Sequence, residues 1–208
     1  MRIYEIMAQG GPVMWPLLAC SIIVVSVVLE RFFYWLRLDH ERDRELLDEV
    51  LTIAEQGDWQ LIRAKTRGCD DHVIRILSVG ILHRDYDMAK AMEAEAQQTV
   101  KKMNRFMTVL DTMITVAPLL GIFGTVLGII SSFKILGAAG IADPKLVTSG
   151  IAQALLTTAT GLGISIITVF PYNFFKSRIA GAIHVMEKYA TSLEVVYQKL
   201  AKDNETGR

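Results

Sequence analysis

Hydroxyl side chains recur inside two long apolar segments of this 208-residue chain, residues 114–136 and 146–175. In an apolar environment, a hydroxyl group can bond to a backbone carbonyl of its own helix and let a neighbouring helix approach closely. A row of such groups can instead line a pore or a cavity. From the residues alone both interpretations stay open. The polar side chains concerned are Thr125 in the first segment and Gln153, Thr157, Thr158 and Ser165 in the second.

Small residues share one face of the helix expected over residues 114–136. At 100° per residue this face carries Ala117, Gly121, Gly124, Thr125, Gly128, Ser131 and Ser132. The opposite face carries Val116, Leu119, Phe123, Val126, Ile130 and Phe133. Because two helices approach closely only where side chains are small, we interpret Gly121, Gly124 and Gly128 as a helix-packing surface. The bulky face is expected to contact lipid.

A second polar face is predicted for residues 146–175. It carries Gly150, Ala154, Thr157, Thr158, Gly161, Ser165, Thr168 and Tyr172, with Gln153 at its margin. Thr125 and Thr158 each lie slightly to the outer side of the middle of their segments, which run in opposite directions. The two hydroxyl groups are therefore expected at similar depth in a membrane, where they would line one surface with Ser165.

Ionisable side chains are missing from the centre of every long apolar segment. Proton and ion relays in membranes usually need an intramembrane ionisable group, which a hydroxyl group does not replace. Alone, this chain is thus a poor proton carrier. Either it conducts nothing, or a partner helix supplies a carboxylate. Asp111 and Lys134, near the two ends of the second segment, are interpreted as structural.

Three uncharged runs, residues 6–29, 112–133 and 146–175, are each long enough to cross a bilayer core of about 30 Å as a helix. The chain is therefore predicted to be an all-α membrane protein, although its 22 basic and 22 acidic residues balance. The expected organisation is an outer segment 1–12, membrane helices 13–36, 108–136 and 146–175, a cytoplasmic helical region 37–107, an outer turn 137–145 and a cytoplasmic helix and tail 176–208; the resemblance described below makes the outer side the periplasm.

The distribution of basic residues predicts the orientation. Almost all Lys and Arg residues lie in 37–107 and 176–208, which places these regions in the cytoplasm and the N-terminus outside it. Arg31 and Arg37 are expected to extend toward the membrane surface.

Helical apolar spacing covers residues 38–55 and 85–107, with turns expected at 57–58 and 67–71. Residues 85–107 contain no helix breaker, so we expect this helix to run without interruption into the second membrane segment. The tail is expected to continue the third membrane helix.

Other functional classes find little support. Cys20 and Cys69 are too few for a disulfide framework, and the four histidines lack the paired spacing of a metal site. No phosphate-binding loop or hydrolase motif occurs in the sequence, and no basic patch interleaved with aromatics indicates nucleic-acid binding. We therefore predict no enzymatic activity, no cofactor and no metal.

Three strings of residues resemble a known family. They are GGPVMWPLL at 10–18, APLLGIFGTVLG at 117–128 and GIAQALLTTATGL at 150–162. Together they resemble the ExbB/TolQ/MotA proton-channel family, most closely ExbB and then TolQ. The resemblance extends over all three membrane segments, and three segments favour the ExbB and TolQ branch because MotA-like stators have four.

This resemblance implies a homopentamer in the bacterial inner membrane, with the second and third membrane helices around a central pore. An ExbD- or TolR-like single-span partner would sit inside that pore and bring the titrating aspartate. Thr125 and Thr158 match pore threonines of the family, whereas Gln153 stands where ExbB has a pore glutamate. Thr157, Gly161 and Ser165 are assigned to the same proton pathway.

The implied function is a motor subunit driven by the proton-motive force, which energises a TonB-type protein for outer-membrane transport. One alternative is a TolQ-like subunit that works through a TolA-like protein in envelope integrity. Another is a membrane scaffold that conducts nothing, in which the small-residue faces only pack.

Overall fold

The computed structural model of the chain describes residues 10–139 and 144–205, and these residues form helices without any strand. Residues 1–9 of the predicted outer segment 1–12 and residues 140–143 of the predicted turn 137–145 lie outside the described residues. The helices are α2 (Met14–His40), α3 (Arg44–Glu55), α4 (Trp59–Lys65), α5 (His72–Leu82), α6 (Met88–Met103), α7 (Met107–Ala139) and α8 (Pro144–Glu205). They divide into two compact units.

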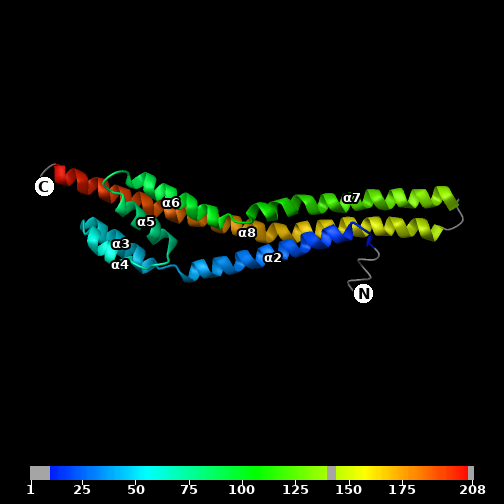
Figure 1. Cartoon of the computed structure of the whole chain (residues 1–208), viewed down its shortest axis with the longest axis horizontal. Coiled ribbons are helices and arrows are strands. Elements are labelled where there is room, and N and C mark those ends of the chain that lie inside the picture. Colours follow the sequence, from blue (N-terminus) through cyan, green and yellow to red (C-terminus); the bar gives the residue numbers. More distant parts are fainter. Residues whose placement is uncertain (1–9, 140–143, 206–208) are drawn as a thin grey trace. The chain divides into compact units, whose positions relative to one another are not determined.

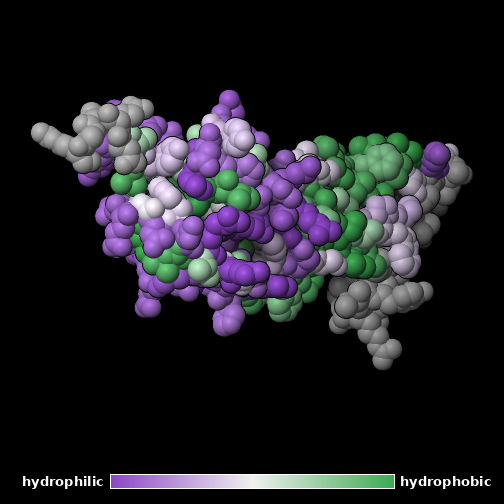
Figure 2. Space-filling model, turned by 60° about the vertical axis from the view of Figure 1, so that its left-hand side comes forward, coloured by the Kyte–Doolittle hydropathy of each residue, from purple (hydrophilic) through white to green (hydrophobic). Residues whose placement is uncertain are grey.

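The first unit comprises Met1–Arg31 and Phe106–Phe175, and it contains α7, most of α2 and the first part of α8. Among the described residues, three helices, α2, α7 and α8, are long and apolar enough to cross a membrane. Figure 1 shows α7 and the first part of α8 running side by side. In Figure 2 hydrophobic residues gather on the surface of this unit, as expected for helices surrounded by lipid.

A small buried cluster joins the helices of the first unit. Val13, Met14 and Leu17 at the start of α2 are buried together with Ala117 of α7. Leu120 of α7 and Ile164 of α8 are partly buried and pack against this cluster. The start of α2 therefore contacts both of the helices that carry the polar faces.

The second unit comprises Phe32–Arg105 and Lys176–Arg208. Short helices here begin at aspartates, whose carboxylates accept hydrogen bonds from the first backbone amides and so satisfy donors that a helix start leaves unpaired. These capping residues are Asp43, Asp58, Asp71 and Asp87. The buried core between the helices includes Leu47, Val50, Ile62, Ile74, Leu77, Ile81, Met186 and Leu193.

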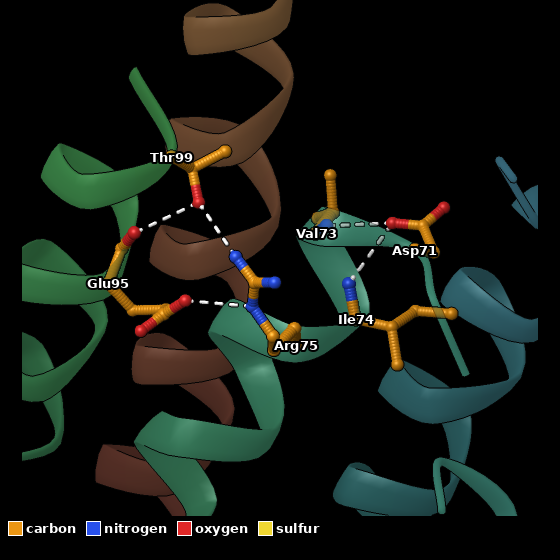
Figure 3. Close-up of polar contacts among 6 residues, drawn as sticks. All are labelled: Asp71, Val73, Ile74, Arg75, Glu95 and Thr99. Atoms are coloured by element: carbon orange, nitrogen blue, oxygen red, sulfur yellow. Dashed lines mark hydrogen bonds and ion pairs between the residues drawn. The ribbon is translucent and has the colours of Figure 1, made fainter. Parts of the chain in front are cut away.

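Polar contacts also connect α5 to α6 in this unit (Figure 3). Arg75 Nε donates to Glu95 Oε1 at 2.7 Å, and its terminal nitrogen donates to Thr99 Oγ1 at 3.3 Å. Figure 3 also shows Asp71, which is fully buried and accepts from the amides of Val73 at 2.7 Å and Ile74 at 3.3 Å. The start of α5 is therefore fixed by a buried carboxylate.

Two predicted continuous helices are interrupted. The helix expected over 38–55 breaks after His40, because Asp43 caps a new helix and accepts from the amide of Leu46 at 3.0 Å. The helix expected to run from 85–107 into the membrane segment also breaks. It ends at Met103, and Phe106 adopts a left-handed backbone conformation (φ 63°) before α7 begins at Met107. Apolar spacing alone does not report such a break.

The third membrane helix does continue into the tail, as the spacing predicted. Helix α8 runs for 62 residues from Pro144 to Glu205. Pro144 occupies the first helical position, where its missing N–H leaves no bond unmade.

Candidate functional site

Thr125 of α7 and Thr158 of α8 meet in the contact between the two helices, and their hydroxyl oxygens are hydrogen-bonded to each other. Thr125 Oγ1 also lies 3.2 Å from the carbonyl oxygens of both Gly121 and Ala154. Thr158 Oγ1 lies 3.1 Å from the carbonyl oxygen of Gly121. Two hydroxyl protons therefore face more acceptors than they can serve at once, so the pair has alternative hydrogen-bonding arrangements.

Glycines allow α7 and α8 to approach this closely. A β-carbon on Gly121 would lie 3.0 Å from both the Thr157 carbonyl oxygen and the Thr158 α-carbon. A β-carbon on Gly128 would lie 2.8 Å from the Ala154 β-carbon. These contacts are tighter than ordinary van der Waals distances. In this chain the glycine face of α7 is therefore turned toward α8.

Two further hydroxyl residues of the polar face of α8, Thr157 and Ser165, are buried. Thr157, 1% exposed, donates to the carbonyl oxygen of Ala154 at 2.8 Å. Ser165, 9% exposed, donates across the contact to the carbonyl oxygen of Ile114 in α7 at 2.7 Å. Gly161 is buried against α7, whereas Thr125 and Thr158 are both partly exposed.

Gln153 lies one turn from this cluster and contacts the segment before α2. Its side-chain amide occupies the place where a β-carbon on Gly11 would stand, and Gly11 has a left-handed backbone conformation (φ 73°). Sequence reasoning assigned residues 1–12 to a segment outside the membrane helices and did not predict this pairing. The glycine itself is the only signal that could have indicated a close approach.

The apolar middle of the site contains no ionisable side chain. Within the described residues, Asp, Glu, Lys, Arg and His are absent from 14–29, 112–133 and 148–175. Asp111 and Lys134 are exposed near opposite ends of α7. The site can therefore offer hydroxyl, amide and carbonyl groups to a proton or a partner side chain, but no titrating group of its own.

Arg31 in the second half of α2 is placed differently from the prediction. It was expected to extend to the membrane surface, but it is only 1% exposed. Its guanidinium pairs with Glu30 at 2.5 and 2.6 Å and lies 5.8 Å from the ring centre of Phe106. An ion pair and an aromatic ring thus replace water around the buried charge. Arg37 is 80% exposed, as expected, and pairs with Glu41.

The chain is similar in sequence to a known protein family. Residues 70–188, more than half of the chain, match the MotA/TolQ/ExbB proton channel family. The chain belongs to this family. The match to the MotA/TolQ/ExbB family includes α5, α6, α7 and most of α8, and so contains both Thr125 and Thr158.

Individual members of the MotA/TolQ/ExbB family align with the chain over different lengths. The biopolymer transport protein ExbB-like 3 of Synechocystis is 30% identical over 91% of this chain and 92% of its own length. The biopolymer transport protein exbB1 of Vibrio cholerae is 26% identical over 78% of this chain and 74% of its own length. The Tol-Pal system protein TolQ of Pseudomonas aeruginosa is 37% identical over 44% of this chain and 39% of its own length.

Proposed function

We propose that this chain is the ExbB-type subunit of an inner-membrane motor driven by the proton-motive force. Five copies would surround a pore that holds the membrane helix of an ExbD-like partner. The motor would energise a TonB-type protein for transport across the outer membrane. Family membership and the similarity to relatives named ExbB support this proposal.

The observation that carries the proposal is the paired hydroxyl groups of Thr125 and Thr158 between described helix stretches, 112–133 and 148–175, that contain no acidic residue. A hydroxyl pair with surplus acceptors can accept a hydrogen bond from, or donate one to, a carboxyl group that moves past it. Because no titrating group lies in the apolar middle of the described helices, proton transfer would require a carboxylate from a partner. A single-span partner with a membrane aspartate meets that requirement.

Within this proposal the predicted site residues occupy different places along the proton pathway. Thr125 and Thr158 would face the partner, since both are partly exposed. Thr157, Gly161 and Ser165 would complete the proton-pathway surface from within the α7–α8 contact. Gln153 would mark the outer end of the pore with an uncharged amide, where ExbB-like proteins carry an acid.

The orientation and location are part of the same proposal. The bacterial inner membrane would contain the three helices, with the basic segments 37–107 and 176–208 in the cytoplasm. The N-terminus and the connection between α7 and α8 would then face the periplasm.

A TolQ-like role in envelope integrity is the second candidate, and the 37% identity to a TolQ protein over 91 residues favours it. The scaffold alternative is supported by the same hydrogen bonds that hold α7 against α8. A measurement of proton flux distinguishes the scaffold, which conducts nothing, from both motor candidates. The identity of the partner protein then distinguishes the ExbB-like motor from the TolQ-like motor.

The direct test is co-expression of this chain with an ExbD- or TolR-like protein from the same organism. The proposal predicts that the two proteins copurify and that native mass spectrometry finds five copies of this chain in each complex. Proteoliposomes that contain the complex should pass protons under a membrane potential, and substitution of the partner's membrane aspartate by asparagine should stop the flux. A complex with another copy number, or flux that persists without the aspartate, would contradict the proposal.

A further inference from the structure

A cavity of about 240 Å³ lies in the second unit, where residues of α2, α5 and α8 come together. Trp35 and Asp39 of α2 line it, together with Arg42 in the turn that follows. His72 at the start of α5, together with Ser177 and Arg178 of α8, completes the polar part of the lining. None of these residues belongs to the polar faces of the membrane helices.

Two N–H groups among these lining residues have no acceptor. Within the described part of the chain, the indole Nε1 of Trp35 and the guanidinium Nε of Arg42 are buried without a hydrogen-bond partner. Trp35 as a whole is only 6% exposed. Because nearly all buried donors in native proteins are paired, two unpaired donors beside one cavity indicate that the acceptor is a ligand or ordered water.

The charges around the cavity favour a ligand with negative charge. Arg178 forms an ion pair with Asp39 and stacks over the ring of Trp35 at 5.1 Å, so the charge of Asp39 is already balanced. Arg42 has no carboxylate partner among the residues that the structure describes. The positive charge of Arg42 is therefore available to bind an anion. A phosphate group suits this site because it is negatively charged and offers several acceptor oxygens.

The position of these residues along α2 indicates where that phosphate comes from. Phe32, Phe33 and Leu36 are 48%, 64% and 51% exposed, and charged residues follow directly after them. Such a change from exposed aromatic and aliphatic residues to charged ones is typical of the membrane–water interface, where lipid phosphates lie.

We propose that this cavity binds a phosphate group, presented by an anionic lipid headgroup, through the Trp35 indole N–H and the Arg42 guanidinium. Free phosphate has the same chemistry and is the second source that the test must distinguish. The proposal does not depend on proton conduction.

The test uses the full chain, purified in detergent and stripped of lipid. Binding of phosphatidylglycerol and phosphatidylcholine is measured by native mass spectrometry, and binding of inorganic phosphate by calorimetry. Trp35→Phe removes one donor and keeps an aromatic ring, while Arg42→Gln removes the charge. Trp59→Phe and Arg63→Gln are matched controls, because neither residue lines the cavity. Circular dichroism verifies that each variant is folded.

Loss of one hydrogen bond to a charged group corresponds to an affinity decrease of about tenfold or more. We expect phosphatidylglycerol to bind more tightly than phosphatidylcholine. Trp35→Phe and Arg42→Gln should each weaken the binding of phosphatidylglycerol by that factor, whereas the control variants should leave it unchanged. If inorganic phosphate alone shows this pattern, the site is a phosphate site supplied from solution. If Arg42→Gln changes the binding of neither phosphatidylglycerol nor phosphate, the proposal is wrong.

Discussion

The side-chain amide of Gln153 fills the space that a β-carbon on Gly11 would need, and Gly11 is held at a φ of 73°. This pair joins the segment before α2 to the first part of α8 within the first unit. A glycine is required at position 11 for two separate reasons, the backbone conformation and the close approach of the amide.

Gly11→Ala is therefore expected to destabilise the protein by about 1–3 kcal/mol for the backbone conformation, plus the cost of displacing Gln153. The matched control is Gly68→Ala, which has a φ of 83° but open space around its β-carbon. Thermal unfolding in detergent should show the larger loss for Gly11→Ala, and Gln153→Ala should recover part of it. Equal losses for the two glycine variants would contradict the packing described for Gln153.

Gly161 and Gly163 differ in their surroundings although they lie two residues apart on α8. A β-carbon on Gly161 would collide with the Ala117 carbonyl oxygen of α7, whereas one on Gly163 would meet open space. Gly161→Ala should cost about 1–3 kcal/mol through overpacking, and Gly163→Ala should be neutral or stabilising because alanine favours helix. Unfolding of both variants in detergent checks this, and a neutral Gly161→Ala would show that α7 and α8 are not in close contact.

Asp71 serves three backbone donors from a fully buried position. Besides the amides of Val73 and Ile74, it accepts from the amide of Asp43 at 3.0 Å, and so joins the start of α3 to the start of α5. Asp71→Ala leaves these donors without an acceptor and should cost about 1–3 kcal/mol or more.

Asp58→Ala is the control for Asp71→Ala, since Asp58 is an exposed cap that accepts only from Leu61 at 3.0 Å. Its loss should cost about 1 kcal/mol. Chemical denaturation followed by circular dichroism compares the two variants. Equal costs would mean that the buried carboxylate does not connect the two helices.

His72 makes stability depend on pH. Burial lowers the pKa of His72 below its ordinary value of 6.5, helped by Arg42 and Arg75 and opposed by Asp71 and Glu41. The unfolded chain therefore binds a proton at higher pH than the folded chain does. Folding is favoured above pH 6.5, and stability falls as the pH decreases through that value toward the lower pKa of the folded state.

The loss between pH 7.5 and 5.5 should be smaller in His72→Gln, which cannot bind this proton. Denaturation midpoints for both proteins at the two pH values, in buffer without phosphate, give the comparison. An unchanged pH dependence in the variant would show that His72 is not the responsible group.

The sequence predicted the membrane helices and their two faces because helix periodicity separates small from bulky residues directly. The exposed and buried sides of α7 follow that separation at Phe123 and Gly124. Breaks in helices were harder to predict. Phe106 has no intrinsic preference for a left-handed conformation, so only its tertiary contacts explain it.

Contacts between segments distant in the sequence were also not predicted. Nothing in the spacing of residues indicated that Gln153 would meet Gly11, or that Arg31 would be buried beside Phe106. The hydroxyl faces were predictable, but a single chain shows only that they meet each other. The pore around them stays a prediction.

Thr158→Val gives the most direct measurement of the central claim, with Thr160→Val as its control. Both changes remove a hydroxyl group from α8, but Thr160 donates only to the carbonyl oxygen of Leu156 in its own helix, at 2.8 Å. Proton flux is measured in proteoliposomes that contain the assembled complex with its ExbD- or TolR-like partner. We predict that Thr158→Val lowers the flux by about tenfold or more, the effect of one lost hydrogen bond to a charged group, and that Thr160→Val leaves it unchanged. Normal flux in assembled Thr158→Val would contradict the proposal that the Thr125–Thr158 pair lies on the proton pathway.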